Sequence, residues 1–183
     1  MNLQTPDKGI NYIVDTPSRS KTGSDPITVS DFKDWAKIEH SADDTLIGSL
    51  ISEIVDQAEP MLDLALVTQD IILIMDIRNN EIRLPFMPIK SLTKIEYFED
   101  KAFKELDPAN YTLMGESVIL DNATATYYRI SYTAGYDTIP VGLNNALKQA
   151  ILTAYQDRED NVEGGVSRIP SHSLNKLMIY KRY

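Results

Sequence analysis

The sequence predicts an α+β fold: a small bundle of about three helices, an antiparallel β insertion between the second and last long helices, and extended arms at both termini. Apolar residues recur every three or four positions in residues 42–65 and again in 140–160, as on the buried face of a helix. Between them, in residues 67–134, the period changes to two, as in a strand. Apolar residues make up 43% of the 183 residues and charged residues 25%, so one domain with a hydrophobic core is expected.

Residues 1–26 are expected to form an N-terminal arm that precedes the main domain, residues 27–160. Thr, Pro, Ser, Lys and Gly are scattered through the arm without a period, so it is predicted to be disordered or extended. A frayed terminus is the preferred interpretation for a monomer. Four residues could instead pair as a short strand with a neighbour: Ile10, Tyr12, Ile13 and Val14.

The first predicted helix is short and covers residues 28–38. Thr28 is a suitable N-cap, and Asp31 follows three residues later, as in a capping box. The apolar face is marked by Phe32, Trp35 and Ala36, and a core role is expected for this tryptophan, the only one in the chain.

The second helix is predicted over residues 42–65. Asp43 and Asp44 lie in its first turn, where acidic residues interact favourably with the helix dipole. Capping explains this pair more simply than a metal site does. Pro60 should kink or locally break the helix, at a cost of about 3 kcal/mol. The apolar stripe consists of Leu46, Ile47, Leu50, Ile51, Ile54, Ala58, Met61 and Leu62.

The β insertion is predicted to contain six strands. Asp70–Asp76 is apolar enough to be buried on both faces, and Gly115 suits a hairpin turn. The segment 99–104 is expected to be a polar connection. The other strands are Glu81–Leu84, Ser91–Phe98, Tyr111–Met114, Ser117–Leu120 and Tyr127–Thr133.

The last long helix is predicted over residues 140–160. Gly135 can end the preceding strand, Thr138 is the expected N-cap, and Pro140 suits the first helical turn. The buried stripe would be Leu143, Ala146, Leu147, Ala150, Ile151 and Ala154.

Residues 161–183 are predicted to be a tail that binds a partner. The tail is too apolar for a solvated linker and too short to fold alone, and such segments usually dock on another protein. Its last 18 residues also carry four basic residues and no acid. The apolar residues are Ile169, Pro170, Leu174, Leu177, Met178, Ile179 and Tyr180.

The net charge of −9 argues against a protein that wraps nucleic acid, because phosphate binding requires Lys and Arg. An acidic surface that aids solubility is the simpler interpretation, and DNA passing through a repulsive channel is compatible with it. The chain has no cysteine, which excludes disulfides and thiolate chemistry. No apolar run is long enough to cross a membrane, and the N-terminus lacks the apolar core of a signal peptide.

No catalytic constellation is found in the sequence. The two histidines, His40 and His172, lie in unrelated contexts, and no pair has metal-ligand spacing. No glycine-rich loop precedes a helix, and no Gly-x-Ser-x-Gly motif is present. We therefore expect no enzymatic activity, no cofactor and no metal.

Four motifs resemble, in the same order, those of the tailed-phage head–tail connector (head-completion or adaptor) family, over about residues 27–180. The first is the Asp43-Asp44 pair with the helix that follows, and the second is Leu84-Pro85 with Pro88-Ile89. The third is Tyr132-Thr-Ala-Gly-Tyr136 followed by Leu147-Lys-Gln-Ala-Ile151. The last is an Ile-Pro, a Leu-x-x-Leu and a basic-aromatic end in the tail.

The resemblance implies a structural virion protein of the neck, made in the host bacterial cytoplasm. Copies, commonly twelve, would form a ring on the portal vertex that extends the DNA channel and offers a docking surface to a stopper or tail-completion protein. DNA would pass without sequence-specific binding, and no membrane is involved. The tail would bind the portal protein through Arg168, Ile169, Pro170, Leu174, Leu177, Tyr180, Lys181 and Arg182.

Two alternatives stay open at this point. The chain could be a tail-completion protein of the same neck, which its binding partner would reveal. It could also be a monomeric α+β domain that binds a peptide or small ligand, which would require an apolar pocket with a few polar groups.

Overall fold

The chain folds into two units in the computed structural model, which describes residues 11–156, 174–175 and 177–181. The β unit comprises residues 1–22 and 68–135, and the helical unit comprises residues 23–67 and 136–183. Each unit is therefore built from two separate stretches of sequence. The predicted α+β class is confirmed, with three α-helices and antiparallel sheets in the part of the chain that the structure describes.

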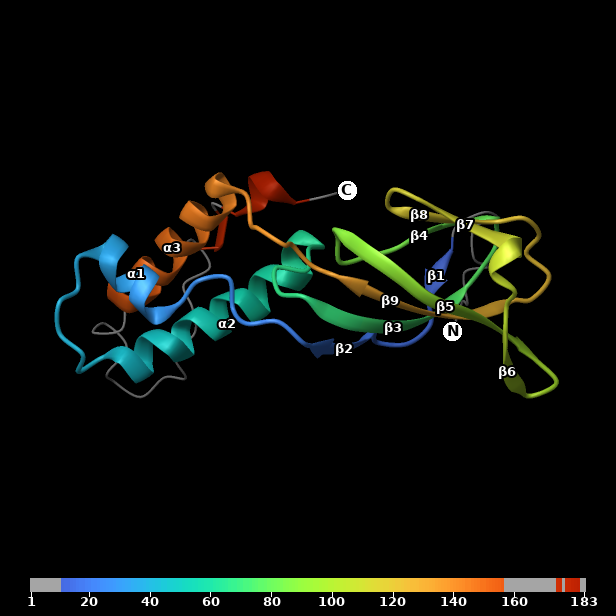
Figure 1. The fold of residues 1–183 in the computed structure, drawn as a ribbon, viewed down its shortest axis with the longest axis horizontal. Coiled ribbons are helices and arrows are strands. Elements are labelled where there is room, and N and C mark those ends of the chain that lie inside the picture. Colours follow the sequence, from blue (N-terminus) through green and yellow to red (C-terminus); the bar gives the residue numbers. More distant parts are fainter. Residues whose placement is uncertain (1–10, 157–173, 176, 182–183) are drawn as a thin grey trace, which may run out of the picture. The chain divides into compact units, whose positions relative to one another are not determined.

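The larger sheet of the β unit is antiparallel and has the strand order β1-β3-β9-β5-β6, with β2 also paired to β3 (Figure 1). Its centre is β9, which pairs with β3 along its whole length and with most of β5. The strands are β1 (Tyr12–Ile13), β2 (Ser18–Lys21), β3 (Gln69–Asp76), β5 (Ile89–Glu99), β6 (Ala102–Glu105) and β9 (Tyr127–Ala134).

The smaller sheet has the order β4-β8-β7 and follows the predicted pattern. Gly115, with φ 61°, makes the turn between β7 and β8, which confirms the predicted hairpin. The strands are β4 (Glu81–Arg83), β7 (Tyr111–Met114) and β8 (Ser117–Leu120), and a short 3-10 helix, η1 (Pro108–Asn110), precedes β7.

One face of the larger sheet is buried and the other is not. In β3, Ile71, Leu73 and Met75 are buried, whereas Ile72 is 45% exposed. The prediction that this strand is buried on both faces is therefore wrong. A continuous apolar run permits two-sided burial, but Ile72 and Ile74 of this run lie on the outer face of the sheet.

The N-terminal arm belongs to the sheet from residue 11 onward. Tyr12 pairs with Asp76 of β3, and Ser20 pairs with Asp70. The Asn11 side chain donates to the Glu81 carbonyl (2.6 Å) and accepts from the Arg78 N–H (2.7 Å). The interpretation as a frayed terminus is wrong for these residues, because β3 offers them an unpaired edge.

A second hairpin was not expected. Residues 99–104, predicted to be a polar connection, instead form a tight turn and the start of β6, which pairs with β5. Asp100 and Lys101 both have positive φ, 52° and 66°, as in the two-residue turns that match sheet twist. This turn usually contains Asn or Gly, so the sequence gives little sign of it.

The helical unit contains α1 (Val29–Ala36), α2 (Asp44–Leu62), α3 (Val141–Gln156) and a 3-10 helix, η3 (Met178–Tyr180). The predicted capping box at the start of α1 is confirmed, because the Asp31 N–H donates to Thr28 Oγ1 (3.0 Å). The core residues include Phe32, Ile47, Ile51, Ile54, Leu62, Leu143, Leu147 and Ile151.

The start of α3 differs from the prediction. The Pro140 carbonyl accepts the Asn144 N–H (2.9 Å), so Pro140 is the residue that begins the helical hydrogen bonding. Thr138 lies two residues too early to be the N-cap. The predicted end, at residue 160, lies outside the described residues.

Pro60 does not break α2, which continues to Leu62 instead of the predicted residue 65. The helix ends at Asp63, whose φ of 58° is left-handed. Just beyond, the buried Glu59 carboxylate accepts the N–H groups of Leu66 (2.8 Å) and Val67 (3.2 Å). A proline in the last turn removes only one helical bond, and Glu59 satisfies the donors that follow.

Candidate assembly surfaces

The C-terminal segment packs on its own helical unit. Leu177 is fully buried, and the Tyr180 hydroxyl lies 2.6 Å from the point that a Cβ on Gly142 would occupy. A side chain at this position in the first turn of α3 would meet the tyrosine hydroxyl and force it to move. Beside these anchors, Met178 is 37% exposed and Ile179 is 80% exposed.

The predicted portal-binding residues are only partly described. Leu177 is buried, whereas Leu174, Tyr180 and Lys181 are half-buried on the same unit. Sequence reasoning did not select Ile179, the most exposed apolar residue of the segment. Nothing in a run of Leu, Met, Ile and Tyr distinguishes the residue that anchors from the one that faces solvent. Arg168, Ile169, Pro170 and Arg182 lie outside the described residues.

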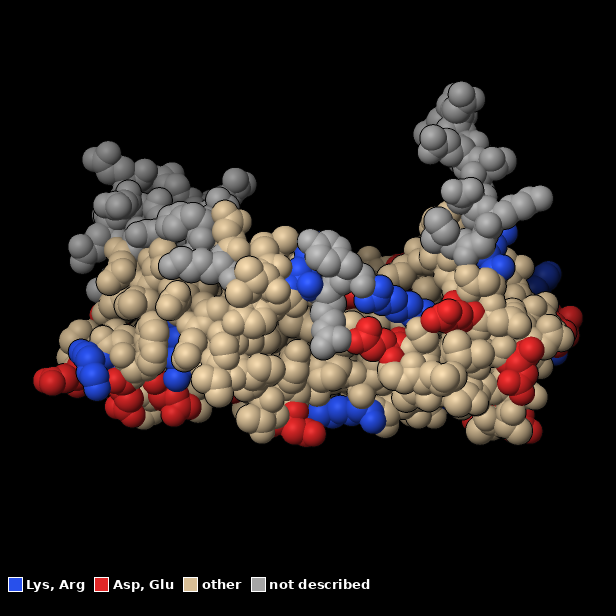
Figure 2. All heavy atoms as spheres, turned by 90° about the horizontal axis from the view of Figure 1, so that it is seen from above, with Lys and Arg blue, Asp and Glu red and all other residues tan. Residues whose placement is uncertain are grey.

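The helical unit is strongly acidic. It contains 15 acidic and 8 basic residues, whereas the β unit contains 12 and 10. Figure 2 shows Asp and Glu, with some Lys or Arg beside them, at one end of the helical unit, and both kinds of charge on the β unit. The net charge of the whole chain therefore comes mainly from the helical unit.

Asp43 and Asp44 contact side chains of the other two helices. Asp43 is the N-cap of α2 but makes no side-chain capping bond, and its carboxylate accepts the Tyr155 hydroxyl (2.5 Å). Asp44 pairs with Lys33 (2.6 Å). The predicted capping role is therefore wrong for the Asp43 side chain, which joins α2 to α3. Among the described residues, no three potential metal ligands lie together.

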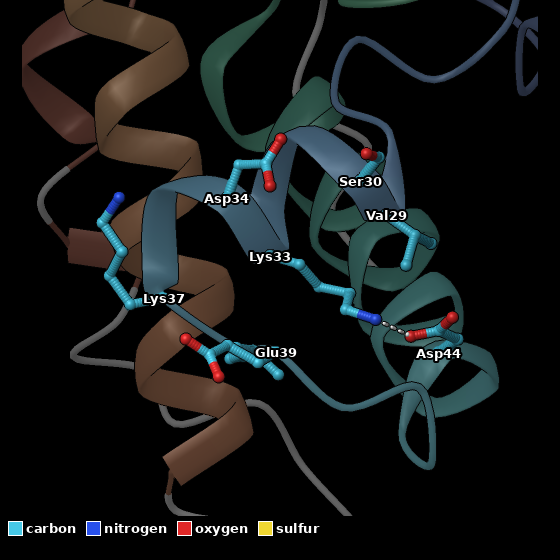
Figure 3. A pocket seen from close by; sticks show the side chains of 8 residues that line it. Val29, Ser30, Lys33, Asp34, Lys37, Glu39 and Asp44 are labelled. Atoms are coloured by element: carbon cyan, nitrogen blue, oxygen red, sulfur yellow. Dashed lines mark hydrogen bonds and ion pairs between the residues drawn. The ribbon is translucent and has the colours of Figure 1, made fainter.

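An open hollow lies beside α1 (Figure 3). The Lys33–Asp44 ion pair crosses it, and most of the labelled side chains are polar or charged. Small-molecule sites are usually enclosed and mainly apolar. This hollow therefore gives little support to the ligand-binding alternative. Its lining consists of Val29, Ser30, Lys33, Asp34, Lys37, Ile38, Glu39 and Asp44.

The β unit carries a cluster of packed side chains on the outer face of its larger sheet, which we call the Arg129 cluster: Glu96, Phe98, Phe103 and Arg129. The Arg129 guanidinium donates to both oxygens of the Glu96 carboxylate (2.7 and 2.5 Å). It also lies 4.4 Å from the centre of the Phe103 ring, and that ring lies 5.2 Å from Phe98.

Electrostatics hold this cluster in the charged state. The hydrogen bonds from Arg129 lower the pKa of Glu96 and outweigh the effect of its burial. The same pair raises the pKa of Arg129. Sequence reasoning missed the cluster, because Glu96 and Arg129 are two of several polar residues in their strands and only the sheet register places them opposite each other.

The described helices include none that is long and apolar enough to cross a membrane. His40 is exposed in the connection between α1 and α2, whereas His172 lies outside the described residues.

Residues 26–181 match the sequence model of a family described as "Head completion protein". This match covers most of the chain and confirms the resemblance seen in the four motifs. No curated protein sequence matches the chain.

Solved structures of phage-like particles share the fold. A chain in the neck of an empty gene transfer agent particle, computed with C6 symmetry, matches with a TM-score of 0.66 and 17% identity, covering 91% of this chain and 96% of that one. A chain in the virion of the native particle gives 0.64 and 18%, covering 90% and 94%. A chain in the native neck, computed with C12 symmetry, gives 0.63 and 15%, covering 91% and 96%.

Proposed function

Because the chain belongs to the head completion protein family, we propose that it is a structural protein of the neck of a phage-like virion, where copies, commonly twelve, form a ring on the portal vertex. The ring extends the DNA channel and gives a stopper or tail-completion protein its docking surface. The observation that carries this proposal is the family match over residues 26–181. Its role is one of assembly and not of catalysis.

The similar chains in necks computed with C6 and C12 symmetry support a ring. A ring requires two different faces on each subunit, because the first face of one copy contacts the second face of the next. A monomer with two distinct units offers such faces.

The acidic helical unit supports passage of DNA without binding. DNA binds where Lys and Arg neutralise its phosphates and release the counterions around them. Residues 23–67 contain ten acidic residues and only two basic ones. A channel lined by this unit repels the duplex and lets it slide.

The C-terminal tail carries the proposed contact with the portal. The basic and apolar residues proposed to complement an acidic partner with an apolar groove are Arg168, Ile169, Pro170, Leu174, Tyr180, Lys181 and Arg182. Since Leu177 is buried in its own unit, it would hold the segment in place while its neighbours contact the portal.

The proposal is tested with purified protein and DNA-filled capsids that bear a portal but no tail. Electron microscopy of the vertex should show a new ring below the portal. Protein that binds only mature tails, or binds neither particle, overturns the connector role.

The tail contact is tested separately in the same assay. Arg168→Glu with Arg182→Glu should reduce capsid binding at least tenfold. The control, Lys37→Glu with Lys148→Glu, makes the same change of charge elsewhere in the helical unit and should leave binding within about twofold. An equal loss of capsid binding in both variants would contradict a specific role of the tail in binding the portal.

A further inference from the structure

The larger sheet ends in two edges that no described strand covers. One edge is β6, and the other is formed by β1 and β2, which both pair with β3. An edge strand presents a row of backbone N–H and C=O groups that can pair with another chain. Both edges belong to the β unit, so every copy carries the two edges in one fixed relation.

The β6 edge has a rigid, partly apolar surface beside it. In the Arg129 cluster, Phe98 is 40% exposed, and its ring packs on Phe103. Phe103 is in turn held under the Arg129 guanidinium, which Glu96 fixes with two hydrogen bonds. Aromatic and arginine side chains that are ordered before binding are typical of the residues that dominate protein interfaces.

The opposite edge is apolar at β1 and basic at β2. Tyr12, Ile13 and Val14 are 37%, 46% and 53% exposed, three consecutive apolar residues at the surface. Next to them, Ser18–Lys21 contains two basic residues and no acid. By contrast, the region of β6, residues 99–107, contains four acidic and two basic residues.

These charges favour pairing between unlike edges. Two β2 edges brought together would place basic residues near each other, and like charges opposite each other destabilise a pair of strands. The β6 strand carries one basic and one acidic residue, Lys104 and Glu105, and three of the residues that flank it, Glu99, Asp100 and Asp107, are acidic. Pairing β6 with β2 therefore avoids the repulsion between basic edges and favours a head-to-tail arrangement.

We propose that the β6 edge of one copy pairs with the β1–β2 edge of the next, so that the larger sheets of neighbouring subunits join around the ring. This inference rests on the proposed function, because a head-to-tail contact that repeats with cyclic symmetry closes into a ring. The exposed apolar residues of β1 and the Phe98–Phe103 pair flank the new backbone hydrogen bonds and are covered in the process.

The test uses cysteine cross-linking in the full chain, which has no native cysteine. Ser20→Cys and Glu105→Cys are introduced together, because both positions are exposed and lie on the outer face of the sheet. Within one copy β2 and β6 are separated by three strands, or about 19 Å at the usual strand spacing. A disulfide needs Cα atoms about 4–7 Å apart, so it can form only between copies.

The double variant is assembled on the portal-bearing, tailless capsids, imaged, oxidised and run on a non-reducing gel. The expected result is a ladder of covalent multimers that ends at the closed ring. The single variants Ser20→Cys and Glu105→Cys are the matched controls and should give nothing larger than a dimer. A second double variant, Ser18→Cys with Glu105→Cys, tests a pairing shifted by two residues, because Ser18 and Ser20 lie on the same face of the sheet.

Suppose that rings are seen on the capsids but neither double variant gives products larger than those of the single variants. That result overturns the sheet-edge contact and leaves the connector role intact. If no protein binds the capsids, the connector role fails, and the same oxidation of the concentrated protein decides the edge contact. A ladder in solution then supports it, and only monomers and dimers overturn it.

Discussion

Carboxylates of the β unit lie beside basic side chains across its strands, whereas acids of the helical unit outnumber its bases almost two to one. Glu96 binds Arg129, and Lys104 binds both Glu99 and Asp100. In the helical unit the fully buried carboxylate, Glu59, accepts backbone N–H groups instead. In the β unit, ion pairs hold side chains on the surface of the sheet in place. In the helical unit, the buried Glu59 carboxylate binds the backbone just beyond the end of α2.

This difference suggests where each unit is vulnerable. Loss of Glu96 leaves the Arg129 side chain, which is 34% exposed and can be solvated by water, so the cost is modest. Loss of a buried acceptor leaves backbone donors without any partner, which costs more.

Glu59→Ala should destabilise the helical unit by about 2–4 kcal/mol, because the buried N–H groups of Leu66 and Val67 lose their acceptor. Urea unfolding followed by circular dichroism measures the change. Glu53→Ala is the matched control on the same helix, since Glu53 is half-buried and its carboxylate accepts a hydrogen bond from the Gln57 side chain (3.3 Å). Equal effects of the two substitutions would contradict the capping role of Glu59.

Glu96→Gln should destabilise the β unit by about 1–2 kcal/mol at neutral pH, the usual range for a charge-assisted hydrogen bond partly open to water. The folded state lowers the pKa of Glu96 below its ordinary value of 4.5. Its contribution is therefore fully present above that ordinary value and is lost as the pH falls through the lower, folded value.

The pH dependence provides the check on that prediction. The difference in free energy of unfolding between the wild type and Glu96→Gln should be constant above about pH 5 and shrink in more acidic solution. A difference that stays constant down to the acid limit would mean that the substitution acts through packing and not through charge.

Two glycine substitutions should have the smallest effects, and they should differ from each other. Gly48→Ala in α2 places a Cβ at an ordinary 3.6 Å from Val29 and should stabilise the helical unit by about 0.5–1 kcal/mol. Gly142→Ala places one 2.6 Å from the Tyr180 hydroxyl and should cancel this gain by displacing η3. Thermal unfolding and protease cleavage near residue 180 follow both effects.

A second substitution tests the cause of that displacement. Tyr180→Phe removes the oxygen that Gly142→Ala would meet, so the double variant should regain the protection of the C-terminal segment from protease. Continued cleavage in the double variant would show that the hydroxyl contact is not what requires a glycine at position 142.

The helices and most strands could be predicted because their patterns are local. The Thr28–Asp31 capping box and the apolar stripe of α2 are readable from residues a few positions apart. By contrast, β6 depends on a turn in which Asp100 and Lys101 adopt positive φ without glycine. The strand pairing of residues 12–21 depends on β3, whose paired residues lie 48 to 64 positions away, so no local pattern could indicate it.

The candidate surfaces were harder to predict than the fold. The family motifs identified an assembly protein, but Leu177 and Ile179 look alike in sequence, and only packing separates the buried anchor from the exposed residue. The Arg129 cluster joins residues from three strands, and its members meet because of sheet register. Such a surface is a property of the assembled sheet and leaves only alternating polarity in the sequence.

The discontinuity of both units has a consequence for synthesis on the ribosome. The apolar face of α2 emerges first, but α3, which contributes Leu143, Leu147 and Ile151 to the same core, follows only after residues 68–135. At about 5–20 residues per second, translation of this intervening stretch takes about 3–14 s. During that interval the nascent chain exposes a helix without its partner, so the cell must protect it from aggregation before the first helical core can close.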